Sequence, residues 1–170
     1  MSSNPDVFPA TLGRRERWST LAAVVLTAGG LTILGFVFAV TRGDPRWMLL
    51  GLPFTLMVFA LGRFAQTGYR VAADGLHVER KAGSKVIAYR TIRAVDRAER
   101  RVSGVTVFGS KGVFGCFGRY WNPSLGFYQL YLTNREHVVW LASDAGLVGL
   151  SPDRPDEFVR SLRGILGQGV

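Results

Sequence analysis

The sequence is poor in the residues that most often carry out catalysis or bind a metal. Its 170 residues include one cysteine and two histidines. Cys116 has no second cysteine for an intramolecular disulfide, so nothing indicates an oxidising compartment. His77 and His137 lie on separate predicted strands, with no cysteine or carboxylate at ligand spacing, which predicts no metal site. No paired carboxylates lie in an apolar setting either, so we expect a protein that is not an enzyme and binds no cofactor.

A nucleophile built on Cys116 would need the fold to bring His137 beside it, and a buried structural thiol is the favoured interpretation. A nucleotide-binding loop is also missing. A Walker loop needs G-x-x-x-x-G-K-[ST], whereas Lys111 precedes Gly112 here and no Ser or Thr follows in place. The fragment KGVFGCF is faintly similar to an RNA-binding strand motif, but the alternating strand–helix order of that fold is absent. We therefore expect no nucleic-acid partner.

Acidic residues are in short supply as well. The chain has 12 Asp and Glu against 21 Lys and Arg, a formal net charge of +9. Of these, 16 basic and 9 acidic residues follow residue 62, so most of the excess lies in the second part of the chain. This balance suits an anionic partner, and it suits equally a domain that lies beside an anionic membrane leaflet.

Charge is absent altogether from Trp18 to Val40. As a helix these residues would rise about 34 Å, against a bilayer hydrocarbon core of about 30 Å. A second apolar run, residues 47–61, becomes long enough if Asp44 caps a helix that starts at Pro45. The predicted segments are a disordered tail over residues 1–17, a transmembrane hairpin over 18–65 with helices at 18–40 and 45–65, and a domain over 66–170.

Basic residues predict the orientation of this hairpin, because they favour the cytoplasmic side of a membrane. The two outer flanks hold more of them than the turn, which contains Arg42 and Arg46; the flanks contain Arg14, Arg15, Arg17, Arg63 and Arg70. We therefore expect a multi-pass protein of the cell membrane with both termini in the cytoplasm. A cleaved signal peptide is disfavoured, since the first run far exceeds an apolar region of about 7–15 residues.

From Tyr69 onward the hydrophobic pattern changes to the two-residue period of strands. The dipeptide Asp74-Gly75 marks a first hairpin, and further short strands follow. Near the end the period becomes helical again, with Asp153 as a cap and Phe158 on the apolar face. About seven short strands closed by one amphipathic helix predict an α+β, mainly β, fold: a strongly bent sheet or barrel plugged by the helix.

The most distinctive stretch is FGSKGVFGCFGRYWNPSLGFYQLYLTN, residues 108–134, where glycines recur every third residue among aromatic residues. On the residues alone, such glycines allow bulges and bends in a twisted sheet whose aromatic side chains pack across strands. Together with the later LSPDRPDEFVRSL, this stretch resembles the bacterial pleckstrin-homology-like (PH) domain family. The matching positions are Gly112, Phe114, Gly115, Phe117, Gly118, Arg119, Tyr120, Trp121, Tyr131, Thr133, Asn134, Ser151, Pro152, Asp153, Pro155 and Phe158.

The resemblance covers residues 67–168. It implies a seven-stranded, two-sheet bent barrel capped by a C-terminal helix, in a membrane-anchored member with two N-terminal transmembrane helices. It implies no reaction, and the motif positions are expected to be mainly structural. Cys116 and Leu150 depart from the residues expected at their places, but both changes are apolar.

The best candidate for a ligand site is the arginine-rich segment 90–101. If it is a strand, Arg93, Arg97 and Arg101 share one face, where each would gain about 1 kcal/mol beside an anionic leaflet. The alternative is a solvated, salt-bridged strand edge that resists aggregation. Two functions follow: a membrane-tethered module that binds a protein partner or self-assembles, or a module that binds or senses anionic lipid. We favour the first, because the tether already supplies membrane localisation.

Overall fold

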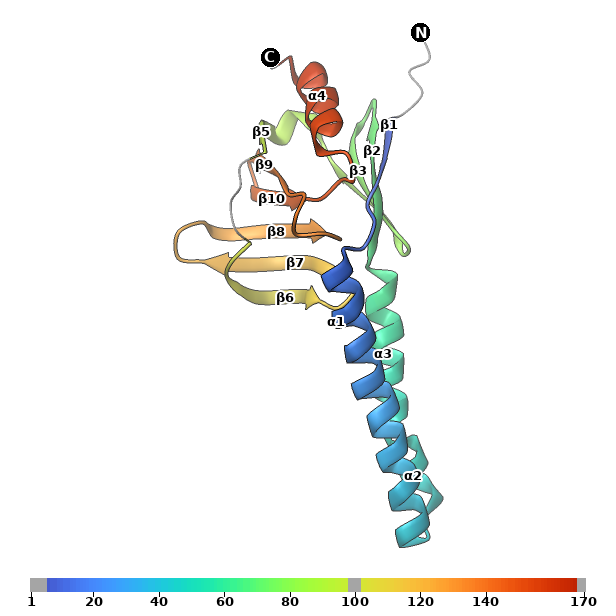
Figure 1. Ribbon diagram of the computed structural model, residues 1–170. Coiled ribbons are helices and arrows are strands. Elements are labelled where there is room, and N and C mark those ends of the chain that lie inside the picture. The colour runs from blue at the N-terminus through green and yellow to red at the C-terminus, as the bar shows by residue number, and fades with distance from the viewer. Residues whose placement is uncertain (1–5, 98–101, 168–170) are drawn as a thin grey trace.

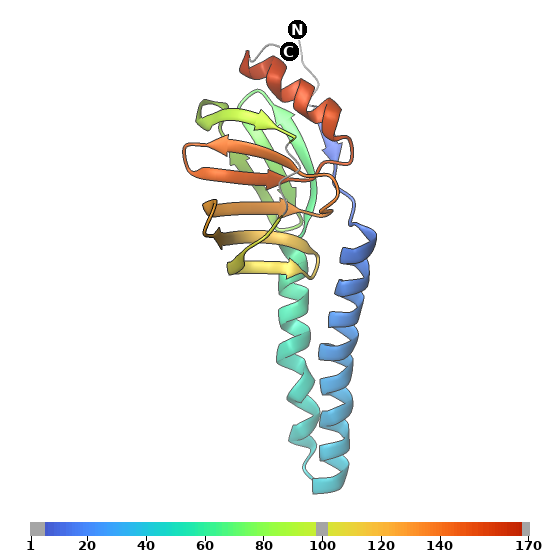
Figure 2. The ribbon, with the colours of Figure 1, turned by 60° about the vertical axis from the view of Figure 1, so that its left-hand side comes forward.

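The computed structural model of the chain describes residues 6–97 and 102–167. Two long helices run side by side from one end of a β-rich domain (Figure 1). A C-terminal helix lies at the opposite end of this domain (Figure 2). The order confirms the predicted class, in which two N-terminal helices precede a mainly β domain that is closed by a helix.

The first long helix is continuous from Arg14 to Arg42. It consists of α1 (Arg14–Val24), one π-helical segment η1 (Val25–Gly29) and α2 (Gly30–Arg42). Gly43 ends it with a φ of 69°, in the left-handed conformation that glycine adopts without strain.

The second long helix starts with the 3₁₀ segment η2 (Pro45–Gly51) and continues as α3 (Leu52–Arg63). Asp44 caps it, as predicted, because its carboxylate accepts a hydrogen bond of 2.9 Å from the backbone N–H of Arg46. Both helices are long and apolar enough to cross a membrane.

The two helices approach closely where small residues face the partner helix. A Cβ at Gly35 would overlap the carbonyl oxygen of Trp47, and a Cβ at Gly51 would overlap the hydroxyl of Thr32. Away from this contact the helices expose large apolar side chains, among them Leu26, Ile33, Val40, Met48, Leu56 and Phe59.

Ten strands form two sheets within the described part of the chain. The first sheet has the order β1-β2-β3-β4 and consists of Asp6–Pro9, Gln66–Ala72, Gly75–Arg80 and Gly83–Ile87. The second has the order β5-β9-β10-β8-β7-β6 and consists of Ile92–Asp96, Val139–Ser143, Gly146–Leu150, Gly126–Leu132, Gly115–Asn122 and Val105–Gly112. Strands β8 and β10 are parallel, and the other neighbours are antiparallel.

This number of strands differs from the predicted seven for three reasons. The segment before the first helix contributes β1. A 3₁₀ turn, η3 (Tyr89–Thr91), separates β4 from β5 within a run that reads as one extended stretch. The glycine-rich stretch supplies a full strand, β7, in addition to β6.

The N-terminal segment corrects the prediction of a disordered tail over residues 1–17. Residues 6–9 form β1, which pairs antiparallel with β2. Phe8 is 5% exposed, and its ring packs edge-on against Phe158 with 5.2 Å between centroids. A short strand that adds one large aromatic ring to the core is stabilised by tertiary contacts that the proline-containing sequence does not reveal. Residues 1–5 lie outside the described range.

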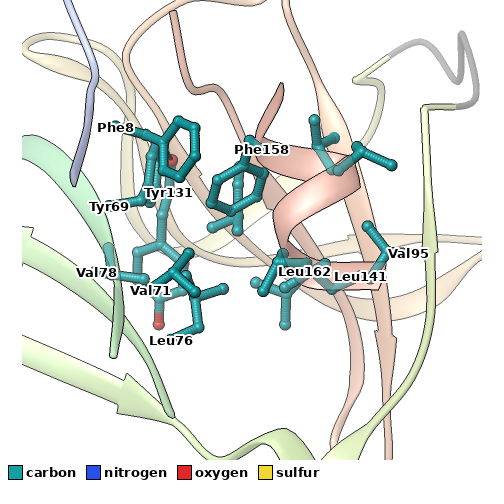
Figure 3. Close-up of a cluster of buried hydrophobic side chains, with 14 of the residues drawn as sticks. Phe8, Tyr69, Val71, Leu76, Val78, Val95, Tyr131, Leu141, Phe158 and Leu162 are labelled. Carbon is teal, nitrogen blue, oxygen red and sulfur yellow. Dashed lines mark hydrogen bonds between the residues drawn. The ribbon is translucent and has the colours of Figure 1, made fainter. Parts of the chain in front are cut away.

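The core lies between the two sheets and beneath α4 (Pro155–Leu166), as Figure 3 shows. Phe158, Val159 and Leu162 form the buried face of α4, at the predicted helical spacing. The hydroxyl of Tyr69 donates a hydrogen bond to the carbonyl oxygen of Tyr131 and accepts one from a backbone N–H at the start of the closing segment. Burial raises the pKa of Tyr69 to about 12, so this phenol stays protonated at neutral pH.

The contribution of β1 can be measured by substitution. Phe8→Ala should destabilise the domain by roughly 3–5 kcal/mol, the usual cost of truncating a buried phenylalanine. Val7→Ala is the matched control, because Val7 is 57% exposed, and it should change stability by less than about 0.5 kcal/mol. Urea denaturation of the full chain in detergent gives both free energies of unfolding. Equal effects would mean that β1 does not contribute to the folded core.

Candidate functional site

A β-hairpin made from the glycine-rich stretch joins the barrel to the helices. Its strands β6 and β7 lie unusually close together at the cross-strand pair Gly109 and Gly118. Both residues have positive φ, 130° and 116°, and a Cβ on either would overlap a carbonyl oxygen of the opposite strand. Glycine is therefore required at these two positions by backbone contact, and not by a ligand.

The tip of this hairpin contacts both long helices through Phe114. The residue has a φ of 57°, and its N–H donates to the hydroxyl of Thr20 in α1 at 2.7 Å. The hydroxyl of Ser19 donates to the carbonyl oxygen of Gly112 at 2.6 Å. On α3, the Phe114 ring lies so close to Gly62 that an added Cβ would be 3.2 Å from Cζ. Phe114 therefore fixes the barrel against the helix pair.

An ion pair between a buried glutamate and a partly exposed arginine reinforces this joint. Glu16, in the first turn of α1, is 4% exposed, and its Oε1 lies 3.4 Å from Nε of Arg135. The same nitrogen donates to Sγ of Cys116 at 3.2 Å. Burial raises the pKa of the Cys116 thiol, and the nearby guanidinium offsets this only in part. The thiol is therefore protonated, as expected of a structural cysteine.

A cavity of about 410 Å³ opens at the end of the barrel where the helices leave it. Its walls come from the inner faces of both sheets and from the C-terminal end of α3. The lining residues are Leu61, Phe64, Gln66, Arg80, Lys85, Phe108, Gly109, Phe117, Gly118, Arg119, Gln129 and Tyr131. Helix α4 covers the opposite end of the barrel (Figure 1). The cavity is lined by residues from the end of α3 and therefore lies at the end near the long helices.

Three basic side chains line this cavity, and none of its lining residues is acidic. They are Arg80 from β3, Lys85 from β4 and Arg119 from β7. The ammonium of Lys85 donates to Oε1 of Gln129 at 2.8 Å and to the hydroxyl of Tyr131 at 2.5 Å. The cavity therefore combines a positive potential with aromatic and aliphatic walls.

The comparison with known families decides what kind of domain this is. The family model described as bacterial PH domain matches residues 67–165, more than half of the chain. The chain belongs to the bacterial PH domain family. No curated protein and no solved structure matches it. PH domains are generally non-catalytic, so the family indicates a non-catalytic module.

Most motif residues of this bacterial PH domain pack in its interior or close its turns. Tyr120 is fully buried, and its hydroxyl donates to the carbonyl oxygen of Ser110. Asn134 accepts the N–H of residue 136 through its side-chain oxygen at 2.9 Å, which closes a turn. Trp121 is partly exposed, whereas Phe117 and Arg119 line the cavity.

The closing motif of the PH domain holds the N-terminal segment. The sequence predicts Asp153 as the cap of the last helix, and this is wrong, because no side chain caps α4. The Asp153 carboxylate instead accepts hydrogen bonds from the N–H and the hydroxyl of Thr11, both at 2.9 Å. Its own N–H donates to the carbonyl oxygen of Pro9 at 3.0 Å. Pro152, Pro155 and Phe158 are buried beside it.

Two arginines of the predicted basic face, Arg93 and Arg97, form ion pairs. Nε of Arg93 lies 2.7 Å from Oδ1 of Asp144, and Arg97 pairs with Asp156. These contacts match the alternative of a salt-bridged strand edge. Arg101, the third predicted member, lies outside the described residues.

The sequence analysis missed the polar residues of the cavity. Gln66, Arg80 and Lys85 occupy three consecutive strands, and the register pairs Gln66 with Arg80 and Lys85 with the core residue Val78. Polar residues at positions where these short strands should face inward could have predicted a polar cavity. Among the described residues, no group of three His, Cys, Asp or Glu side chains is placed to bind a metal.

The ion pair at the joint gives a second test. Glu16→Ala should destabilise the chain by roughly 1.5–3 kcal/mol, the range for a charge-assisted hydrogen bond, because the partly exposed Arg135 loses its counter-charge. Glu136→Ala serves as the control, because it removes the exposed acidic side chain that directly follows Arg135 in the chain. Urea denaturation in detergent measures both variants. A loss no larger than that of the control would mean that the pair does not stabilise the joint.

Proposed function

We propose that the protein is a non-catalytic, multi-pass membrane protein that holds a bacterial PH domain at the cytoplasmic surface of the cell membrane, where the domain recruits a protein partner. The observation that carries this proposal is the joint between the domain and the helices. Phe114 and the Glu16–Arg135 pair fix the domain to the helix pair. A domain fixed in this way does not have to find the membrane, so its free faces can serve a partner.

Membrane insertion is supported by the surface of the helices. A core helix of a soluble protein would be mostly buried, whereas large apolar side chains cover these two, with Leu26 and Phe59 both 73% exposed. A continuous apolar surface of this length needs an apolar environment. The bilayer is the environment that a helix pair with such a surface fits best.

The cytoplasmic orientation is supported by the basic residues at the domain end of the helices. Arg14, Arg15 and Arg17 start α1, and Arg63 ends α3. At the far turn, the guanidinium of Arg42 lies 5.1 Å from the centroids of the Phe38 and Trp47 rings. The turn holds only Arg42 and Arg46, so the positive-inside rule favours a cytoplasmic domain.

The surface that we assign to the partner is the free edge of β4. Among the described strands, β4 pairs only with β3, so its outer edge can accept another strand. Val86 on this strand is exposed. Lys81 and Arg90, which flank this strand, are exposed, and residues 80–90 contain no acidic residue. We therefore assign to this edge an extended acidic segment of another protein; a second copy of this basic chain is disfavoured by like charge.

The orientation can be tested with single cysteines in a Cys116→Ala background. Ser3→Cys should resist an impermeant maleimide added to intact cells, whereas Thr41→Cys, beside the far turn, should be labelled. Permeabilised cells provide the control for Ser3→Cys, which should then react. Labelling of Ser3→Cys in intact cells would overturn the cytoplasmic assignment.

The partner surface can be tested by placing a photo-crosslinking residue at Val86 in the full chain in native membranes. We expect one adduct of discrete mass, which disappears when Lys81→Glu and Arg90→Glu reverse the charge beside β4. The exposed Ala145, in the turn between β9 and β10, is the matched control position and should give no adduct. An adduct of twice the chain mass would replace the proposal by self-assembly, and the absence of any adduct would overturn it.

A further inference from the structure

Three apolar side chains form one row across the second sheet, and all three are exposed. Val105 of β6 pairs with Trp121 of β7, which pairs in turn with Phe127 of β8. Directly paired residues point to the same side of a sheet, so these three residues form an apolar row on one face. Their exposed fractions are 66%, 41% and 53%.

The apolar row lies on the inner face of the second sheet, the face that is turned toward the first sheet. Gln129 follows Phe127 by two residues in β8 and therefore points to the same side. Its Oε1 accepts a hydrogen bond of 2.8 Å from Lys85 of β4 in the first sheet. The apolar row therefore continues a face that the first sheet covers farther along β8.

The apolar row begins where the first sheet ends. The hydroxyl of Tyr69 in β2 donates to the carbonyl oxygen of Tyr131 in β8. Two strands farther across the first sheet, Lys85 of β4 reaches Gln129, two residues back along β8. Phe127 is the next inward residue in this direction, and among the described strands none lies beyond β4. The turn between β7 and β8 projects away from the first sheet (Figure 1), so one more strand beside β4 would cover the row.

The bilayer would reach only one end of the apolar row. Strand β6 is the strand of the second sheet nearest the long helices in both views of the ribbon (Figures 1 and 2). Neighbouring strands are about 4.8 Å apart, so Phe127 lies roughly 10 Å farther from the helices than Val105 does. A row of aromatic and aliphatic side chains that leads away from the helices suits the surface of another protein, where such residues are enriched.

We propose that the partner segment at β4 is an amphipathic strand, in which apolar residues that pack on the apolar row alternate with acidic residues. This inference rests on the proposed recruitment at β4 and adds the sequence pattern that the partner carries. Side chains alternate between the two faces of a strand, so a strand paired with β4 presents every second residue to the row. Its acidic residues meet the exposed Lys81 and Arg90, which precede and follow β4. At the border of the row, the Arg119 guanidinium lies 4.8 Å from the centroid of the Phe127 ring and adds a third positive charge.

Two synthetic peptides of identical composition and charge test the pattern. In the first, valine and glutamate alternate; in the second, the same valines form one block that is flanked by the glutamates. Fluorescence anisotropy of the labelled peptides, titrated with the full chain in detergent micelles, measures both affinities. The alternating peptide should bind at least about tenfold more tightly, because only it can present all its valines to one face. Equal affinities would mean attraction by charge alone, and this result, like the absence of binding by both peptides, overturns the proposal.

Two variants test the contribution of the apolar row to binding of the alternating peptide. Phe127→Ala should weaken it roughly tenfold, as expected for truncation of an aromatic anchor. Val105→Glu changes a residue that is 66% exposed, so the fold is kept, and it should weaken binding at least as much by like charge. Ile165→Ala, at a residue of α4 that is 50% exposed, is the matched control and should bind as the unsubstituted chain does. Unchanged binding in both row variants, or equal weakening by Ile165→Ala, would contradict the proposal.

The native partner provides the last test, with a photo-crosslinking residue at Phe127 in the full chain in native membranes. We expect the adduct to contain the same partner segment as the adduct formed from Val86. Since Val86 is exposed on the outer side of β4, the two crosslinked positions in that segment should be separated by an odd number of residues. An adduct from Val86 without one from Phe127 would overturn this inference and leave the recruitment at β4 intact, whereas no adduct from either position overturns both. A lipid adduct at Phe127 would assign the row to the bilayer instead, which also overturns the inference.

Discussion

The contact of Phe114 with the two long helices sets how the PH domain is attached to them. It requires a tight turn at the end of β6 and β7, a small residue at position 62, and hydroxyl groups on α1 that satisfy the backbone of the tip. The glycine-rich motif of the bacterial PH domain allows β6 and β7, the strands that carry this turn, to lie close together at Gly109 and Gly118. The most distinctive stretch of the sequence therefore builds the attachment to the helices, and its strands β6, β7 and β8 also contribute residues to the cavity.

The two ends of the barrel differ in what fills the space between the sheets. At the end far from the helices, α4 fills the space between the sheets with apolar side chains, and the polar groups there are paired, as the Tyr69 hydroxyl illustrates. At the end near the helices the C-terminal end of α3 forms one wall, and three basic side chains line the space. The polar end of the domain therefore lies beside the segments that we propose to be in the bilayer.

Much of the fold could be predicted from the sequence, because it depends on local patterns. Charge-free runs and the Asp44-Pro45 pair predict the two helices, and the spacing of Phe158 and Leu162 predicts the buried face of α4. Features that depend on contacts between distant residues could not be predicted. The partners of Arg93 and Arg97 lie some fifty residues or more along the chain, and Gln66 meets Arg80 only through strand register. Strand β1 could not be predicted, because the residue that stabilises it, Phe8, packs against Phe158, which lies far away in the sequence.

Strand β1 precedes the first long helix, and β2 follows the second, yet the two strands are neighbours in one sheet, with Phe8 opposite Tyr69. The helix pair is thus an insertion between two adjacent strands, and its two ends are held at the spacing of a strand ladder. During synthesis β1 emerges first and has no partner until both helices have been made. Pairing of β1 with β2 therefore requires the second helix to return to the level at which the first began, so the completed sheet fixes both ends of the helix pair.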